Sequence, residues 1–282
     1  MGVNTVTPIP EIEEIVGKFR AGEAEVAQRF FQEKRPLGQH LDWLRFQVAR
    51  EARNLEEIAS HQRCELVEQV DRSVSRETLV DQLTEDYQEV RHYGMLAYIY
   101  EGISGERVQW RELRETAQQA SWYELSRREH QRWADLKAGG SELELAAALF
   151  TRGGGGSLFY GMIPLRGGDY EEALSRASKT ILRDEIEHGA SEGRDDLYRL
   201  IGSRDDVVTA SRIIAEMGAI RLEMRNEQYG KPMPAERLEE IREGAIAPVT
   251  MEEMLSACPR DGEDWFEWYR ERPKPLSAAS VL

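Results

Sequence analysis

The sequence predicts an all-α protein, and three observations support this class. Apolar residues recur every three or four positions along most of the 282-residue chain, the spacing that places them on one face of a helix. Alternation of apolar and polar residues, the pattern of a half-buried strand, is nearly absent. A composition with 32% charged and 40% hydrophobic residues suits a helix-rich globular chain rather than a disordered one.

The composition also excludes several classes of partner. A net charge of −15 argues against general affinity for nucleic acid or for an anionic membrane. No apolar run approaches the roughly 18–20 residues that span a bilayer, and the N-terminus has no signal-peptide pattern. Cys64 and Cys258 are far apart and lack metal-ligand spacing, which fits a reducing compartment. We therefore expect a cytoplasmic protein that binds neither nucleic acid nor membrane.

The first half of the chain is expected to form long helices separated by short breaks. Glycine and proline mark the breaks, in "RPLG", "GISGE" and "AGG". The expected helices cover residues 10–33, 38–72, 77–101 and 106–138. A further helix begins in "SELELAAALF", where Ser141 and Glu144 have the spacing of a capping box.

A glycine-rich segment, "TRGGGGSLFYGMIPLRGGD", interrupts the pattern after residue 150. Four consecutive glycines cannot hold a helix by propensity, so this segment either bends or unwinds a helix near a ligand or forms a plain loop. Helices are expected again over 169–202 and 204–228. Short helical pieces among prolines follow from residue 230, and we expect the aromatic side chains of "DWFEWYRERP" to pack on the rest of the protein.

Two copies of the pattern E-x-x-H lie on these expected helices. One contains Glu89 and His92 in "YQEVRHYG", and the other contains Glu185 and His188 in "DEIEHG". Positions i and i+3 share a helix face, so a carboxylate and an imidazole can reach one metal ion together. Both pairs fall on or beside the apolar side, where an ionised carboxylate needs a partner, a proton or a metal. The alternative is two pairs of polar residues at helix edges.

Two further glutamates are candidates for the same centre. Glu51 lies on the apolar face of the 38–72 helix. Glu144 shares a face with Ala147 and Ala148, whose small side chains leave room for a substrate or O₂. Glu144 could equally be only a capping residue, and Glu124 of the preceding helix is its rival. The predicted metal ligands are Glu51, Glu89, His92, Glu144, Glu185 and His188.

In this order the residues resemble the ferritin-like di-iron carboxylate superfamily, whose bundle reads E … E-x-x-H … E … E-x-x-H. Separations of 38 residues from Glu51 to Glu89 and 41 from Glu144 to Glu185 suit antiparallel helix pairs. The longer gap between Glu89 and Glu144 is more similar to the oxygenase and ribonucleotide-reductase small-subunit branches than to compact ferritin. The resemblance covers about residues 38–202.

The resemblance implies a fold for residues 38–202, and the helical pattern outside them, which matches no family, completes the expected domain organisation. We expect a ferritin-like four-helix bundle with additional helices over residues 38–202. An N-terminal tail and helix would occupy residues 1–37. A C-terminal helical extension, residues 203–282, would pack on the bundle.

The resemblance also implies an activity. Two iron ions, or a manganese–iron pair, would react with O₂ to hydroxylate, desaturate or N-oxygenate a small or medium-sized organic substrate. No nicotinamide or flavin fingerprint is evident, so a separate electron donor is expected, and a homodimer is one compatible assembly. Asp184 and Glu85 are candidate acceptors for the second ring N–H of the ligand histidines. Core packing is the commoner role for Tyr93, and no catalytic residue is identified beyond the ligands.

Three alternatives stay open. The heme-oxygenase-like di-iron oxidases offer a second resemblance, because Glu85 and His92 have their E-x6-H spacing and Glu185 and His188 match the acid and histidine of their final helix. Their further histidine, however, would fall on Ile181. Ferroxidase or metal-storage activity is the second alternative. A metal-free helical interaction protein is the third.

Overall fold

A computed structural model describes most of the chain, and most of its described residues are helical. The description covers residues 9–58, 68–70, 72–109, 112–113, 115, 123–152, 156–187, 191–258 and 264–282. Over these ranges two isolated bridges occur, Arg35–Val281 and Val70–Val74, and there is no strand. None of the described helices has both the length and the apolar character needed to cross a bilayer. The predicted all-α class is confirmed, while the ferritin-like bundle stays a prediction.

The chain divides into two units, each built from three segments. Unit 1 takes its residues from 1–33, 121–165 and 178–262, and unit 2 takes its residues from 34–120, 166–177 and 263–282. Both units therefore combine segments that are distant in the sequence, whereas the regions expected from the sequence were continuous stretches.

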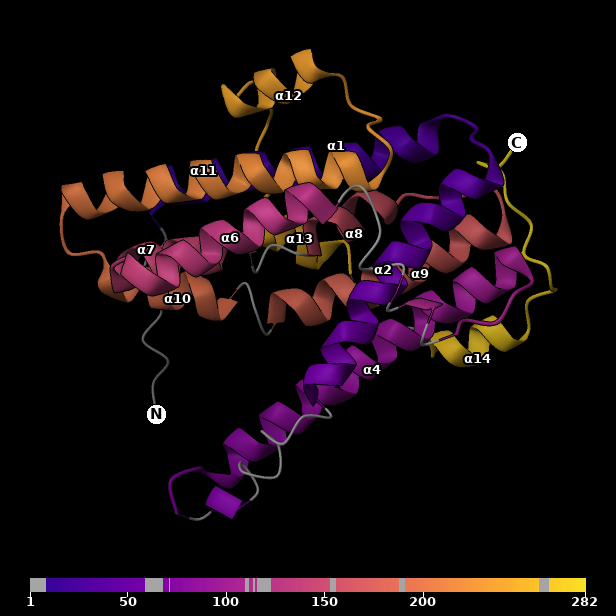
Figure 1. The fold of residues 1–282 in the computed structure, drawn as a ribbon, viewed down its shortest axis with the longest axis horizontal. Coiled ribbons are helices and arrows are strands. Elements are labelled where there is room, and N and C mark those ends of the chain that lie inside the picture. The colour runs from indigo at the N-terminus through magenta and orange to yellow at the C-terminus, as the bar shows by residue number, and fades with distance from the viewer. Residues whose placement is uncertain are drawn as a thin grey trace. The chain divides into compact units, whose positions relative to one another are not determined.

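Unit 1 is built around two long helices, α1 (Pro10–Gln32) and α11 (Arg204–Gln228), which lie side by side (Figure 1). A proline in its first turn favours the start of α1, and the Ser203 side chain caps α11 by accepting from the N–H of Asp206. Four further helices pack around this pair: α6 (Tyr123–Gly139), α7 (Glu142–Arg152), α8 (Ser157–Met162) and α10 (Ser191–Leu200).

Helix α8 lies within the glycine-rich segment, for which the sequence predicted a bend or a loop. It packs on α1, and Gly161 makes the contact possible. A Cβ atom at Gly161 would lie 2.3 Å from the carbonyl oxygen of Ala24. This distance is too short for a Cβ atom, so no residue with a side chain fits here unless the backbones move apart. The glycine therefore serves close packing between backbones.

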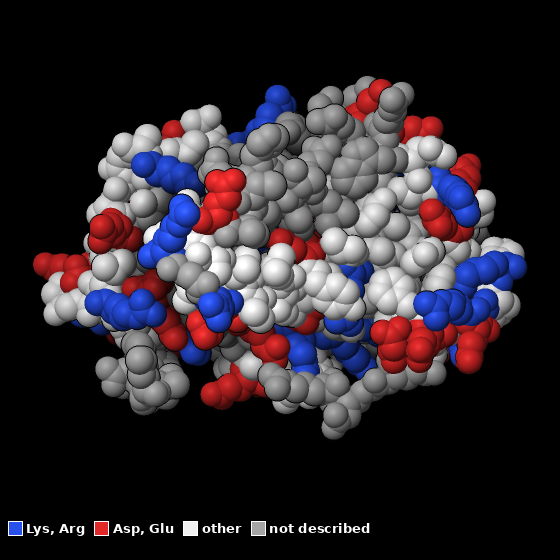
Figure 2. Space-filling view, turned by 90° about the horizontal axis from the view of Figure 1, so that it is seen from below, with Lys and Arg blue, Asp and Glu red and all other residues white. Residues whose placement is uncertain are grey.

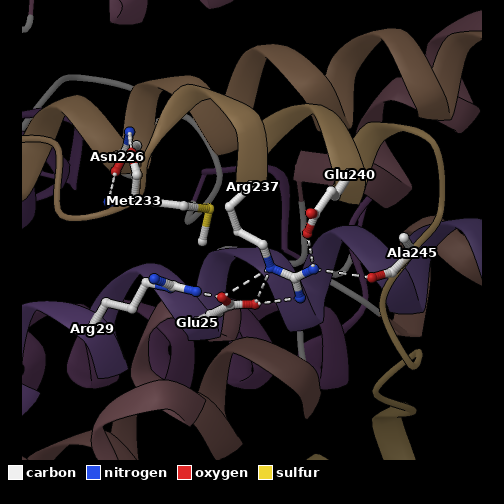
Figure 3. A network of polar contacts seen from close by, with 7 residues as sticks. All are labelled: Glu25, Arg29, Asn226, Met233, Arg237, Glu240 and Ala245. Carbon is white, nitrogen blue, oxygen red and sulfur yellow. Dashed lines mark hydrogen bonds and ion pairs between the residues drawn. The ribbon is translucent and has the colours of Figure 1, made fainter.

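An ion-pair network fastens helix α12 (Ala235–Arg242) to α1 (Figure 3). The Arg237 guanidinium donates to Glu25 at 2.9 Å and to Glu240 at 2.7 Å, and Arg29 also donates to Glu25, at 2.7 Å. The Asn226 side chain exchanges two hydrogen bonds of 2.9 Å with the backbone of Met233. These contacts fix the turn that connects α11 to α12.

Unit 2 contains the antiparallel helices α2 (Leu37–Ile58) and α4 (Arg76–Ser104), which lie against each other (Figure 1). The Ser75 side chain caps α4 by accepting from the N–H of Thr78 at 3.0 Å. Gly105 ends the helix with φ of 75°, a left-handed conformation that glycine adopts without strain. Both ends of α4 lie within a few residues of the predicted bounds.

The C-terminal segment completes unit 2. Helix α14 (Trp265–Arg270) buries Trp265, whose indole N–H donates to the carbonyl of Ala173 at 3.2 Å. The buried Glu171 carboxylate accepts from the backbone N–H of Ser280 at 2.8 Å. The backbone N–H of Arg35 donates to the carbonyl oxygen of Ser280 at 2.9 Å. The expected packing of the aromatic tail is therefore confirmed within this unit.

Several helix boundaries differ from the prediction. Residues 106–109 are not helical, so the predicted start of the 106–138 helix is wrong. The expected 169–202 helix is divided into α9 (Asp169–Glu185), which contributes to both units, and α10. Ile186 and Glu187 form a π-helical turn directly after α9, an irregularity that is frequent at functional sites. Helix α13 (Met251–Ser256) is one of the expected short pieces of the tail.

Candidate metal centre

Three of the predicted ligands meet in unit 2. One ligand atom each from Glu51, Glu89 and His92 lies within 4.8 Å of the other two. The Glu51 and His92 side chains are buried, with 5% and 2% of their surface exposed, and Glu89 is half-buried. Among the described residues this is the group of acidic, cysteine and histidine side chains whose arrangement could hold a metal ion.

Helix periodicity places each of the three side chains. Glu51 follows the fully buried Leu44 and Val48 on the inner face of α2, at spacings of seven and three residues. On α4, Glu89 and His92 are three residues apart, so they point to the same side of the helix. Because α2 packs against α4, the two inner faces bring the three side chains together.

Gln47 supports the group from one turn earlier on α2. Its amide Nε2 donates to Oε1 of Glu51 at 2.7 Å, and both side chains are buried. The hydrogen bond helps to hold the carboxylate in one orientation. Gln47 was not predicted from the sequence, although its position four residues before Glu51, one helical turn away, is visible there.

The donor set fits a divalent transition metal. Two carboxylates and one imidazole give mixed oxygen and nitrogen ligation, which suits iron, manganese or zinc bound without thiolates. The two carboxylates carry two negative charges when ionised, and burial makes such charges costly unless a cation or donors compensate them. One divalent ion balances this charge. The group is therefore chemically suited to hold a metal ion.

Glu144 has a different environment, in unit 1. Its Oε2 accepts from the backbone N–H of Ser141 at 3.0 Å, and the Ser141 hydroxyl accepts from the N–H of Glu144 at 3.3 Å. Its Oε1 accepts from Arg212 at 2.9 Å. These hydrogen bonds form the capping box, which was the alternative to a ligand role for Glu144, and the ion pair with Arg212 adds to it. Glu124, the rival candidate, is exposed at the start of α6.

The remaining predicted ligands are Glu185, the last residue of α9, and His188. Glu185 is half-buried in unit 1. Burial lowers the pKa of Arg221, but Glu23 and Glu129, with a smaller contribution from Glu185, raise it above its usual value. His188 lies outside the described residues. The ligand roles of Glu144, Glu185 and His188 therefore stay predictions.

The structure also describes Glu85 and Asp184, the candidate acceptors for the ligand histidines, and Tyr93. Glu85 accepts from the Gln82 amide at 3.2 Å on α4 and is not part of the three-residue group. Asp184 is buried on α9. Tyr93 is half-buried, and burial raises the pKa of its phenol, with a further contribution from Glu101.

The surface charge agrees with the acidic composition. On the face drawn in Figure 2, acidic and basic side chains are interleaved, and no continuous basic area is visible.

Comparison of the chain with protein-family models, with curated proteins and with solved structures found no match.

Proposed function

We propose that the protein is an O₂-dependent non-heme iron oxidoreductase acting on a small or medium-sized organic substrate. The observation that carries this proposal is the convergence of Glu51, Glu89 and His92 on the buried faces of α2 and α4. The ordered acids and E-x-x-H pairs, which resemble the di-iron carboxylate proteins, motivate iron as the metal and two ions as the number. Bound ferrous iron would supply the reducing electrons for O₂ activation.

The chain's own residues have defined tasks in this proposal. Glu51 and Glu89 would supply carboxylate oxygens, and His92 would supply a ring nitrogen. Gln47 would hold the Glu51 carboxylate in place through its 2.7 Å hydrogen bond to Oε1. The buried positions of Glu51 and His92 would limit the access of water to the centre.

The two resemblances in the sequence differ in the acid that accompanies His92. The ferritin-like pattern uses Glu89, and the heme-oxygenase-like pattern uses Glu85. The three-residue group contains Glu89, which supports the first pairing for this helix. A substitution at each position can test the choice.

The first experiment is an anaerobic titration of the metal-free protein with Fe(II), followed by admission of O₂ while the visible spectrum is recorded. The proposal predicts stoichiometric binding and an O₂-dependent absorbance change. Both should be lost in Glu51→Gln, Glu89→Gln and His92→Ala. A stoichiometry of two would require ligands beyond these three, whereas a stoichiometry of one would reject the di-iron form.

Glu85→Gln is the matched control, because Glu85 lies one turn before Glu89 on the same helix and is also half-buried. It should bind iron like the wild type. Loss of iron in Glu85→Gln with retention in Glu89→Gln would favour the heme-oxygenase-like pairing. Absence of saturable binding in the wild type would reject the metal centre, and accumulation of ferric mineral in large assemblies would indicate iron storage instead.

A further inference from the structure

A buried arginine in unit 1 has no hydrogen-bond partner among the described residues. Arg20 of α1 is only 3% exposed, and none of its three guanidinium nitrogens makes a hydrogen bond there. Arg20 lies over an aromatic ring, with its Cζ 5.2 Å from the ring centroid of Phe150 on α7. A cation–π contact of this kind offsets part of the cost of the buried charge but supplies no acceptor oxygen to the N–H groups.

A charge in this position is costly. Burial lowers the pKa of Arg20 to about 10, with opposing contributions from nearby acids, so the side chain is still protonated at neutral pH. A buried charge without donors or acceptors loses its hydration and gains nothing in return. Buried guanidinium groups are therefore paired in proteins, and Arg20 requires a partner that supplies acceptor oxygens.

The nearby carboxylates are already engaged. Glu13 accepts from the Tyr198 hydroxyl at 2.7 Å, and Glu23 accepts from Arg221 at 3.1 Å and from Arg225 at 3.4 Å. Arg20, Arg221 and Arg225 are all buried, as are Glu23 and Glu129. Glu129 in turn accepts from Arg152 at 2.6 Å. None of these carboxylates accepts a hydrogen bond from Arg20, so its N–H groups have no acceptor among the described residues.

We propose that Arg20 binds the carboxylate group of a small organic acid. The five N–H groups of a guanidinium form a fork that matches the two oxygens of a carboxylate. A monoanion neutralises the single unpaired charge, and the Phe150 ring suits a ligand with an apolar body. A phosphate carries more charge at neutral pH, so its desolvation and its repulsion by Glu13 and Glu23 would cost more.

This site is separate from the proposed metal centre in its residues and in its test. Arg20, Phe150, Glu13 and Tyr198 belong to unit 1, whereas Glu51, Glu89 and His92 belong to unit 2. Carboxylate binding can be measured on metal-free protein. A negative result at either site therefore leaves the other unaffected.

The test is isothermal titration calorimetry of acetate, benzoate and inorganic phosphate into the metal-free full chain, in dilute Tris buffer at low salt. Wild type is compared with Arg20→Lys, Arg20→Met and Arg199→Met. Arg199 is the matched control, because it is an exposed arginine of α10 that pairs with Asp196 at 2.8 Å. A carboxylate should bind the wild type and Arg199→Met equally, at least tenfold more weakly to Arg20→Lys, and not at all to Arg20→Met.

Thermal unfolding without ligand provides the second readout. Because Arg20→Met removes a costly unpaired charge, its melting temperature should equal or exceed that of the wild type, and added carboxylate should stabilise only the wild type. A lower melting temperature for Arg20→Met without ligand would identify Arg20 as a structural residue and overturn the proposal. Equal carboxylate binding in both proteins, tighter binding of phosphate, or no binding of either carboxylate would also overturn it.

Discussion

Gln47 donates a hydrogen bond to Oε1 of Glu51 over 2.7 Å, from one turn earlier on the same helix. The pair is buried, so the hydrogen bond holds the carboxylate in one orientation. Groups that orient a ligand in this way commonly contribute to metal affinity without touching the ion. Gln47 is therefore a positioning residue in the proposed centre.

Replacement of Gln47 by alanine should weaken metal binding by about 10–100-fold, the usual effect of losing a hydrogen bond to a ligand. The measurement is a competition titration with Fe(II) or Mn(II) under anaerobic conditions. Gln82→Ala is the control, because Gln82 donates to Glu85 outside the group. Equal affinities in both variants would mean that Gln47 has no role in positioning the ligand.

Glu144→Ala should destabilise the protein by about 0.5–2 kcal/mol and leave metal binding unchanged, because the side chain closes a capping box and pairs with Arg212. The hydrogen bond from the Ser141 backbone, followed by Arg212, lowers the pKa of Glu144. The stability difference should therefore be complete above about pH 4.3 and disappear as the pH falls through the lowered value. Urea unfolding of the wild type and of Glu144→Ala at several pH values measures this stability difference. Loss of iron binding in Glu144→Ala would instead identify Glu144 as a ligand.

The sequence predicted the features that depend on local periodicity. The bounds of α1, α4 and α11 follow apolar spacing and capping residues, and helix projection placed Glu51 on a buried face. Features set by packing were missed. Helix α8 forms despite its glycines because it lies on α1, and no periodicity distinguishes the π-helical turn after Glu185. No prediction was made for Arg20, because only the neighbouring helices determine that it is buried.

Glu23→Gln should reduce the free energy of unfolding by about 3–5 kcal/mol, because it removes the carboxylate that accepts from two buried guanidinium groups. Glu14→Gln is the control on the same helix. Glu14 is exposed and pairs with Lys18 one turn away, so its loss should cost less than about 1 kcal/mol. Denaturant unfolding of the two variants compares them directly, and equal losses would contradict a structural role for the buried pair.

His40 should make stability depend on pH. Its imidazole is buried, with Nε2 3.1 Å from the carbonyl oxygen of Ser280 and Nδ1 3.3 Å from the Tyr170 hydroxyl. Burial lowers the pKa of His40, against the opposing effects of Ser280 and Glu171. The unfolded chain therefore binds the proton more tightly, and stability should be complete above about pH 6.5 and decrease below it.

The comparison for His40 is urea unfolding of the wild type and of His40→Asn between pH 8 and pH 5. The decrease toward low pH should be smaller in His40→Asn. His130→Asn is the control, because the His130 side chain is exposed. A decrease of the same size in His40→Asn and the wild type would show that other groups cause the pH dependence.

Gly161→Ala should destabilise unit 1, because the new Cβ would lie 2.3 Å from the Ala24 carbonyl oxygen and the two backbones would have to separate. Overpacking of this kind typically costs about 1–3 kcal/mol.

Gly38→Ala is the matched control. Gly38 lies in the first turn of α2, and an added Cβ there meets no atom within 4 Å. Because alanine restricts the unfolded chain, this substitution should stabilise by up to about 1 kcal/mol. Equal melting temperatures for the two variants would show that α8 does not pack on α1 at Gly161.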